Sequence, residues 1–177
     1  MKAYVTSIGE PTTELCLWSL ERHGIETVLI QDKSSLANKL SMIYEQADDD
    51  FIRVDADVIV NRNIRRLPEN KDIWWWQFHT YDWFKQDIAW GGVQYYKKET
   101  LPILRKHMGE AMHLERPESY LYRLKEFHDP RRCIGDPVIM GLNGYKQDDV
   151  ARVKYVKTRR KQLDNYDFEL SDRISAL

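Results

Sequence analysis

The first third of the chain alternates short apolar runs with longer amphipathic segments. Residues 2–8, 27–30 and 51–54 (KAYVTSI, TVLI and FIRV) have the apolar, β-branched composition that is typical of buried strands. Between the first two runs, a helix is predicted to begin near Pro11 and to end at Gly24, because glycine often follows the last turn of a helix. The pattern therefore predicts a strand, a helix and a second strand in direct succession.

The segment between the second and third apolar runs predicts another helix. It is expected to begin at Ser34 and Ser35, whose hydroxyls can accept hydrogen bonds from the first free amides of a helix. Its apolar residues fall on one helical face, at Leu36, Leu40, Ile43 and Ala47. Strands joined by short helical connections are typical of a parallel sheet with right-handed crossovers. We therefore predict an α/β fold in which helices flank a mostly parallel sheet.

The pattern after residue 60 is less regular. Strands are predicted over residues 58–60, 72–78 and 89–96, and helices over 99–107, within 110–127 and near 136–143. The chain shows no repeat, low-complexity tract or linker, so we predict a single domain over residues 1–177.

Composition and charge exclude several classes of protein. The 177 residues are 42% hydrophobic and 31% charged, with a net charge of −1, which indicates a globular chain with no general attraction to nucleic acid or membranes. Cys16 and Cys133 lie far apart and outside any C-x-x-C pattern, which predicts neither a zinc site nor a disulfide. The N-terminal segment MKAYVTSIGEP is too short and too polar for a secretory signal. No apolar run reaches the roughly 18–20 residues that span a bilayer. We therefore expect a cytoplasmic protein.

Aromatic residues are frequent, with six Trp and ten Tyr. They indicate either a well-filled core or a surface on which ligands stack. Three successive tryptophans, Trp74, Trp75 and Trp76, cannot all face inward on one strand, so at least one is expected to point outward, where a sugar ring could pack.

Polar residues follow each of the first three predicted strands. They include Thr6, Ser7 and Gly9 after the first strand, Asp32 after the second, and Asp55 and Asp57 after the third. Because ligands of open parallel sheets bind beyond the carboxyl ends of the strands, these residues are expected to share one ligand-binding edge.

Asp55 and Asp57 are the strongest candidates for chemistry at that edge. In an extended strand their side chains point to the same face, where two carboxylates repel each other unless a cation lies nearby. A divalent ion that prefers oxygen ligands would resolve the repulsion and leave positions open for substrate phosphates. The alternatives are that both are solvated acids in a turn, or that they pair with nearby arginines, such as Arg62, Arg65 or Arg66.

Three stretches together resemble the nucleotide-sugar glycosyltransferases of the GT-A fold. They are FIRVDADVIVNRNI (51–64), WGGVQYYKKETL (90–101) and IGDPVIMGLNGYK (134–146). In that family the D-x-D motif ends a hydrophobic strand and leads into a short strand that crosses toward the acceptor half. The resemblance implies a compact, single-domain, Rossmann-like GT-A fold, with a nucleotide-binding half over about 1–60 and a sugar and acceptor half over about 61–177.

The resemblance also implies roles for the nucleotide-binding half. The loop after the first strand would cradle the base through Thr6, Ser7 and Gly9, and the following polar residues would reach the uracil, the ribose or the phosphates through Asp32, Asn38 and Lys39. Asp55 would contact the ribose or a metal-bound water. Asp57 would ligate the Mn²⁺ or Mg²⁺ that bridges the diphosphate.

In the second half, the resemblance implies that Gly91 and Gly92 let the donor sugar approach the backbone, with Trp90 beside them in the substrate site. Asp136 would be the general base, with Asp82 and Asp87 as alternatives, or it would simply cap a helix opened by the following proline. The late histidine that many of these enzymes give to the metal is missing. Basic residues of the tail are candidates to neutralise the diphosphate instead, namely Lys154, Lys157, Arg159 and Arg160.

We therefore interpret the chain as a metal-dependent glycosyltransferase that moves a sugar from a UDP-sugar to an unknown hydroxyl acceptor on a glycan, a lipid or a modified DNA base. A nucleotidyltransferase is the alternative enzyme, although that class usually has a Gly-rich, basic loop after the first strand and TSIGEPTTE has one Gly and no basic residue. A nucleotide-sugar-binding module without turnover is the non-enzymatic alternative. Several clusters of basic residues are compatible with a nucleic-acid acceptor, whereas a net charge near zero does not favour one.

Overall fold

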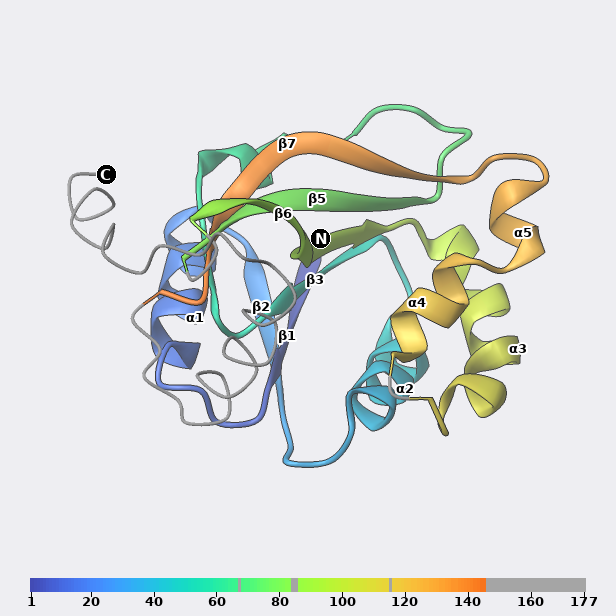
Figure 1. The fold of residues 1–177 in the computed structure, drawn as a ribbon, viewed down its shortest axis with the longest axis horizontal. Coiled ribbons are helices and arrows are strands. Elements are labelled where there is room, and N and C mark those ends of the chain that lie inside the picture. Colours follow the sequence, from blue (N-terminus) through green and yellow to red (C-terminus); the bar gives the residue numbers. More distant parts are fainter. Residues whose placement is uncertain (67, 84–85, 115, 146–177) are drawn as a thin grey trace, which may run out of the picture.

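The computed structural model describes residues 1–145, apart from residues 67, 84–85 and 115, and contains one seven-stranded sheet with the strand order β2-β1-β3-β6-β5-β7-β4 (Figure 1). The strands are β1 (Lys2–Ser7), β2 (Glu26–Gln31), β3 (Phe51–Asp55), β4 (Val58–Val60), β5 (Trp75–Asp82), β6 (Asp87–Tyr96) and β7 (Cys133–Asn143). The helices are α1 (Thr13–Arg22), α2 (Leu36–Gln46), α3 (Leu101–Ala111), α4 (Pro117–Tyr122) and α5 (Lys125–His128). Short 3-10 turns cover Arg62–Arg65 and Lys98–Thr100.

The N-terminal part is the predicted parallel α/β unit. β1 lies between β2 and β3 and is parallel to both, which confirms the predicted fold class. The second half of the chain adds β6 antiparallel to β3, β5 antiparallel to β6, β7 parallel to β5, and β4 antiparallel to β7. The carboxyl ends of β1, β2, β3, β5 and β7 therefore lie along one edge of the sheet, which we call the carboxyl edge.

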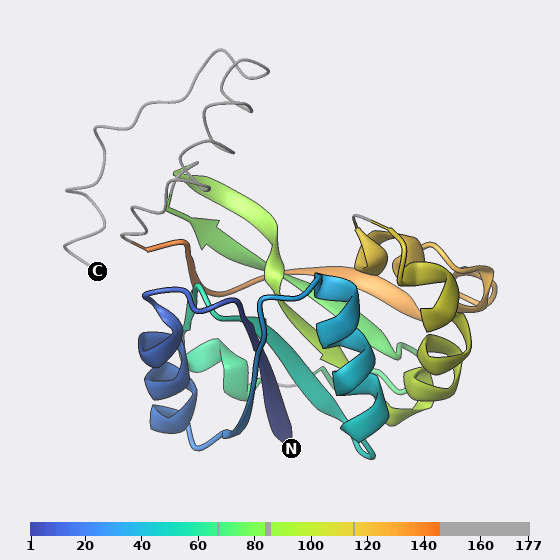
Figure 2. The ribbon, with the colours of Figure 1, turned by 90° about the horizontal axis from the view of Figure 1, so that it is seen from below.

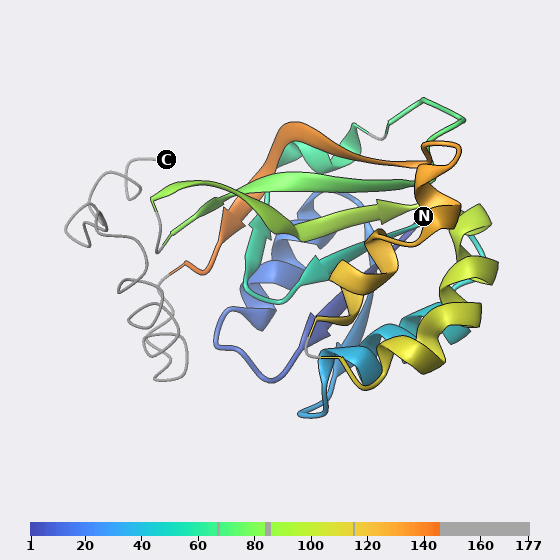
Figure 3. The same ribbon diagram turned by 45° about the vertical axis from the view of Figure 1, so that its right-hand side comes forward.

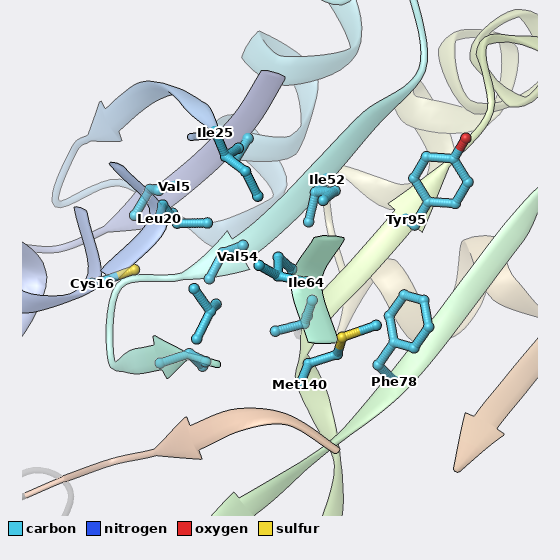
Figure 4. Packing of buried hydrophobic residues seen from close by; sticks show 14 of the residues in the cluster. Val5, Cys16, Leu20, Ile25, Ile52, Val54, Ile64, Phe78, Tyr95 and Met140 are labelled. Carbon is cyan, nitrogen blue, oxygen red and sulfur yellow. The ribbon is translucent and has the colours of Figure 1, made fainter. Parts of the chain in front are cut away.

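Hydrophobic cores cover both faces of the sheet. On the α1 face, Val5, Val54 and Phe78 pack with α1 and with the turn after β4, as Figure 4 shows from close by. On the α2 face, Phe51 and Trp75 pack with helices α2 to α5. Figure 2 shows α1 and α2 on opposite sides of the parallel strands, as right-handed crossovers to strands on either side of β1 require.

The covering of both faces explains the three tryptophans. Trp75 and Trp76 point to opposite faces of β5, yet both are buried, with 0% and 1% of their surface exposed. Trp74 lies just before β5 and is half-buried, with the Arg132 guanidinium 3.7 Å from its ring centroid. The expectation that an outward-pointing tryptophan of this triplet would be open to solvent is therefore wrong for Trp75 and Trp76.

The helix predicted near residues 136–143 is also wrong, because this segment is part of β7. Pro137 lies where the pairing of β7 with β5 is irregular, between the partners of Phe78 and His79. A proline is tolerated in a sheet at such a bulge because the missing amide is not needed for a ladder hydrogen bond. The apolar residues that resembled a helix face instead pair with β5 on one side and with β4 on the other.

The remaining predicted elements are shifted rather than absent. The helix expected over 99–107 is α3, and the helical stretch within 110–127 contains α4 and the start of α5. Ser35 caps α2 as predicted, since its hydroxyl accepts a hydrogen bond from the Asn38 amide at 3.3 Å. Within the described residues, no helix is long and apolar enough to cross a membrane.

β5 and β6 form a hairpin that extends past the neighbouring strand. β6 pairs with β3 only from Val93 to Tyr96, so its first six residues lie beyond the last pair, that of Val54 with Val93. The pairing of β5 with β6 is irregular between Gln77 and His79, next to the glycine pair of β6. Figure 3 shows the resulting hairpin projecting past β3 at the carboxyl edge.

Candidate functional site

The loop after β1 is closed by its own side chains. The Ser7 hydroxyl lies 2.6 Å from Glu10 Oε2 and 2.9 Å from the Thr13 hydroxyl, and it accepts the Gly9 amide at 2.8 Å. Gly9 has φ +95°, which glycine adopts without the strain that other residues would incur. Glu10 also accepts the Ile8 amide at 2.8 Å. The predicted nucleotide loop is therefore preshaped, and Glu10 is a member of it that the sequence analysis missed.

The loop after β2 lies directly beside this first loop. The Asp32 amide donates to the Ser7 carbonyl at 3.0 Å, and Asp32 Oδ1 accepts the Ser34 amide at 2.6 Å. Lys39 is only 4% exposed, and its ammonium donates to the carbonyls of Asp32 at 2.9 Å and Ser34 at 2.8 Å. Burial lowers the pKa of Lys39 despite the nearby carboxylates of Asp32 and Glu10. Its described contacts thus hold the loop in place.

Asp55 ends β3 and has a partner that the sequence analysis did not consider. Its Oδ1 accepts a hydrogen bond from the Thr6 hydroxyl at 3.0 Å and pairs with the Arg53 guanidinium. Arg53 is 5% exposed and also donates to Gln94 Oε1 at 3.3 Å. Burial disfavours the charged guanidinium, but the Asp55 carboxylate more than offsets this, so the pKa of Arg53 is raised. Arg53 stands two residues before Asp55 on one strand, a period-2 spacing that could have revealed the pair.

Asp57 lies in the turn between β3 and β4 rather than on an extended strand. The strand argument that placed it on the same face as Asp55 is therefore wrong. Its carbonyl accepts the Gly144 amide at 2.8 Å, which brings the end of β7 to this turn. Asn143 pairs with Val58 on one side and with Asp82 on the other, so Asp82 also lies at the carboxyl edge.

The described residues supply oxygen donors for a divalent ion only in part. No group of three His, Cys, Asp or Glu side chains that could hold a metal ion occurs among them. One oxygen of Asp55 already pairs with Arg53 and accepts the Thr6 hydroxyl, so this oxygen is less available to a metal ion. Mg²⁺ and similar ions keep several waters and substrate phosphates as ligands, so a site with one or two protein carboxylates fits them.

The glycine pair of β6 lies beside the same edge. Gly91 and Gly92 have φ +124° and +79°, a region in which other residues are strained. A Cβ at Gly92 would lie 2.6 Å from Val58 Cγ2, so the close approach of β6 to β4 also requires glycine. Trp90 is 55% exposed and lies on the part of the hairpin that extends past β3.

The structure separates Asp136 from this edge. It pairs with Phe78, whose side chain belongs to the α1-face core, so Asp136 faces the α1 side while Arg53 and Asp55 face the α2 side. β7 is also three strands away from β3, or about 14 Å at ordinary strand spacing. The predicted helix start that motivated its catalytic role does not exist, because Asp136 Oδ1 accepts the Val138 amide within β7.

The remaining candidates lie elsewhere. Asp87 is exposed near the hairpin tip and accepts the Ile88 amide at 2.7 Å. The acidic run before β3 lies at the opposite edge, where Asp50 accepts the Tyr95 hydroxyl at 2.7 Å and the Lys98 amide at 2.9 Å, a structural role. The basic candidates of the tail, Lys154, Lys157, Arg159 and Arg160, lie outside the described residues.

Comparison with solved structures identifies the fold. No family profile and no curated protein matches the chain in sequence. A glycosyltransferase involved in glycosylation of the major capsid of PBCV-1 matches with a TM-score of 0.59 at 16% identity, covering 88% of this chain and 98% of that one. The catalytic domain of Drosophila β1,4-galactosyltransferase 7 matches with a TM-score of 0.52 at 10% identity, covering 81% and 68%.

The same fold occurs in other transferases. A 4-diphosphocytidyl-2C-methyl-D-erythritol synthase from Anaerococcus prevotii matches with a TM-score of 0.53 at 9% identity, covering 93% of this chain and 99% of that one. At these identities the matches establish the fold alone. The chain therefore has the GT-A-like fold that its D-x-D context predicted, and this fold also serves nucleotide chemistry other than glycosyl transfer.

Proposed function

We propose that the chain is a metal-dependent glycosyltransferase that uses a nucleotide-diphosphate sugar, with UDP as the expected nucleotide and a hydroxyl group as acceptor. The observation that supports this best is the meeting of the loops after β1, β2 and β3 at one edge, joined by the hydrogen bond from Thr6 to Asp55. In open sheets with parallel strands this edge is where ligands bind, and the fold is shared with glycosyltransferases.

Each part of the edge has a task in this proposal. The preshaped loop from Ser7 to Gly9 receives the base, and Asp55, held by Arg53, accepts a hydrogen bond from the ribose. Asp57 would hold the divalent ion. When bound, Mn²⁺ or Mg²⁺ stabilises the negative charge that develops on the leaving diphosphate. The glycine pair Gly91–Gly92 leaves room for the donor sugar against the backbone.

The general base is assigned differently from the sequence-based expectation. If the reaction inverts the sugar configuration, a carboxylate must reach the acceptor hydroxyl directly or through one water. Asp82 is the last residue of β5 and lies at the carboxyl edge, in the same cross-strand row as Asn143 and Val58, whereas Asp136 lies seven residues before the carboxyl end of β7. We therefore assign Asp82 the role of base in place of Asp136.

Nucleotide binding is the first test. UDP should raise the melting temperature, and Mn²⁺ should increase the shift, because a ligand that binds only the folded state stabilises it. Asp57→Ala should remove the Mn²⁺-dependent part of this shift. Asp48→Ala is the matched control, since this exposed acid lies at the opposite edge of the sheet and should behave as wild type. Absence of a shift with any nucleoside diphosphate, with or without metal, would contradict the proposal.

A nucleotidyltransferase is the second candidate, since the synthase of a diphosphocytidyl compound shares the fold. The loop after β1 disfavours it, because its contacts are made by hydroxyls, amides and Glu10 rather than by basic side chains. The two reactions are separated by their products. A glycosyltransferase releases UDP from a UDP-sugar in the presence of Mn²⁺, whereas a nucleotidyltransferase releases pyrophosphate from a nucleoside triphosphate and a sugar phosphate.

A further inference from the structure

The β5–β6 hairpin forms a wall beside the proposed donor site. Six residues of β6 lie beyond its last pair with β3, which corresponds to a projection of about 15–20 Å at ordinary strand rise. In Figure 1 this part of the hairpin lies at the left, while α3, α4 and α5 cover the sheet at the right. The helices that bury the α2 face near Trp75 therefore do not cover the same face of the hairpin.

Burial along β5 shows which side of this wall is open. Thr80 and Asp82 are 0% and 7% exposed on the α1 face. His79 and Tyr81 alternate with them and are only half-buried. Trp75 faces the α2 side, and His79 lies four residues after it on the same strand, so His79 also faces the α2 side. The open side of the hairpin is therefore the α2 side, which Arg53 and Asp55 also face.

Trp90 is the most exposed large side chain on this open side. It is 55% exposed, and it pairs across the hairpin with His79, whose ring centroid lies 3.7 Å from its own. Its indole lies against the backbone of Gly135, where a Cβ would be only 2.2 Å from Trp90 Cη2. The ring is thus supported from β5 and β7 together. The nearby Ile88 is 48% exposed and extends the apolar surface.

We propose that Trp90 is the stacking platform for a carbohydrate acceptor, an inference that rests on the proposed glycosyltransferase function and names its acceptor class. A supported indole with an accessible surface packs well on the apolar C–H side of a pyranose ring. His79 and Tyr81 supply polar atoms on the same strand face for the sugar hydroxyls.

The charge of the wall favours a neutral ligand over a nucleic acid. Between Phe78 and Gly92, the sequence has two acidic residues, Asp82 and Asp87, and one basic residue, Lys85, which gives a net charge of −1. A nucleic acid whose bases stacked on Trp90 would bring its phosphates toward these carboxylates, whereas such binding normally needs basic residues. A neutral sugar has no such cost.

Saturation-transfer NMR with a panel of methyl β-D-pyranosides (gluco, galacto, manno and xylo) tests the platform, both without nucleotide and with UDP and Mn²⁺ present. At least one glycoside should bind the wild type, and Trp90→Ala should weaken it by about tenfold or more, which corresponds to about 1.4 kcal/mol. Trp18→Ala is the matched control, because Trp18 is 50% exposed on α1, away from the hairpin. It should bind as wild type does.

Gly135→Ala provides a second variant that keeps the indole but displaces it. The added Cβ cannot coexist with the present ring position, so glycoside binding should fall as in Trp90→Ala, while the thermal shift with UDP stays as in the wild type. Circular dichroism and the melting temperature check the fold of each variant.

Three results would overturn the proposal: unchanged glycoside binding by Trp90→Ala, absence of binding by every glycoside in a wild type that does bind UDP, or Trp90-dependent binding of an eight-residue oligothymidylate in place of the glycosides. Failure of the proposed function is distinct. In that case no nucleotide stabilises the wild type, and the glycoside series measured without nucleotide still decides for or against the platform.

Discussion

The carboxyl edge and the hairpin wall are built in opposite ways. At the edge, polar side chains are held by hydrogen bonds to one another. Thr6 donates to Asp55, and Asp55 pairs with Arg53. On the wall, glycines and an irregularity in strand pairing determine the path of the backbone, and the side chain of Trp90 is 55% exposed. Under the proposed function, the edge would hold a fixed arrangement for the donor, and the wall would present a surface to a more variable acceptor. Substitutions of the buried side chains and of the glycine pair should therefore change stability or chemistry, and substitutions of exposed side chains on the wall, such as Trp90, should change ligand binding.

The largest expected effect concerns where the chemistry occurs. Asp82→Asn should reduce turnover by about 10²–10⁴-fold, because it keeps the shape of the side chain and removes its basicity. Asp136→Asn should change turnover by less than about tenfold, since Asp136 lies seven residues before the carboxyl end of β7 and three strands from β3. The measurement is UDP release from a UDP-sugar with Mn²⁺ and an acceptor glycoside. Near-normal turnover of Asp82→Asn together with a large loss in Asp136→Asn would reverse the assignment.

The next effect tests whether the edge is a mutually bonded unit. Arg53→Met should lower the free energy of unfolding by about 2 kcal/mol, because the Asp55 carboxylate loses its charged hydrogen-bond partner but, at 35% exposure, keeps part of its hydration. The double variant Arg53→Met/Asp55→Asn should recover part of this loss, since no uncompensated charge remains. Urea denaturation of the four proteins of this cycle gives the coupling energy. Additive losses would mean that the pair contributes nothing beyond its separate residues.

A smaller effect sharpens the role of backbone shape on the wall. Gly92→Ala should destabilise the fold by about 1–3 kcal/mol, because φ is +79° and the new Cβ would lie 2.6 Å from Val58 Cγ2. Gly109→Ala is the matched control, because it lies in α3 with nothing within 4 Å of the added Cβ. It should stabilise by about 0.5–1 kcal/mol through helix propensity. Thermal denaturation measures both. Equal effects of the two substitutions would contradict a special conformation at Gly92.

The smallest effect is a pH dependence from Lys39. Its folded pKa is lowered by burial, so between that pKa and the unfolded value the unfolded chain binds more protons and stability rises with pH. The free energy of unfolding of the wild type relative to Lys39→Met should therefore increase as pH rises toward the unfolded pKa, about 10.4. Urea denaturation of both proteins at several pH values between 7 and 10 measures the difference. A difference that stays constant or falls with pH would show that burial does not lower the pKa of the Lys39 ammonium.

The sequence by itself determined the parallel half of the protein. Apolar runs of strand length, the one-sided helix after Ser35 and the glycine after α1 led to β1, α1, β2, α2 and β3 in the right order. Local signals suffice there because each element is joined to the next by a short connection, so neighbours in sequence are also neighbours in space. The same reasoning placed Thr6, Asp32 and Asp55 at one edge, where the Thr6 hydroxyl donates to Asp55 and the Asp32 amide donates to the carbonyl of Ser7.

In the second half, the sequence predicted several elements to within a few residues, but only the tertiary structure decided the order of the strands and the strand at residues 136–143. Residues 136–143 carry an apolar pattern that suits a helix as well as a strand, and the choice was made by pairing with β5 and β4, which lie more than 50 residues earlier in the chain. Trp75 and Trp76 are both buried because distant helices cover both faces of β5, which alternation along one strand cannot reveal. The contact of the Trp90 ring with Gly135 likewise joins segments that are distant in sequence, so the local pattern does not predict it. Contacts between segments distant in sequence leave no local periodicity, so the sequence pattern does not reveal them. These contacts place Asp82 at the carboxyl edge, where Asp55 also lies, and place Asp136 away from that edge.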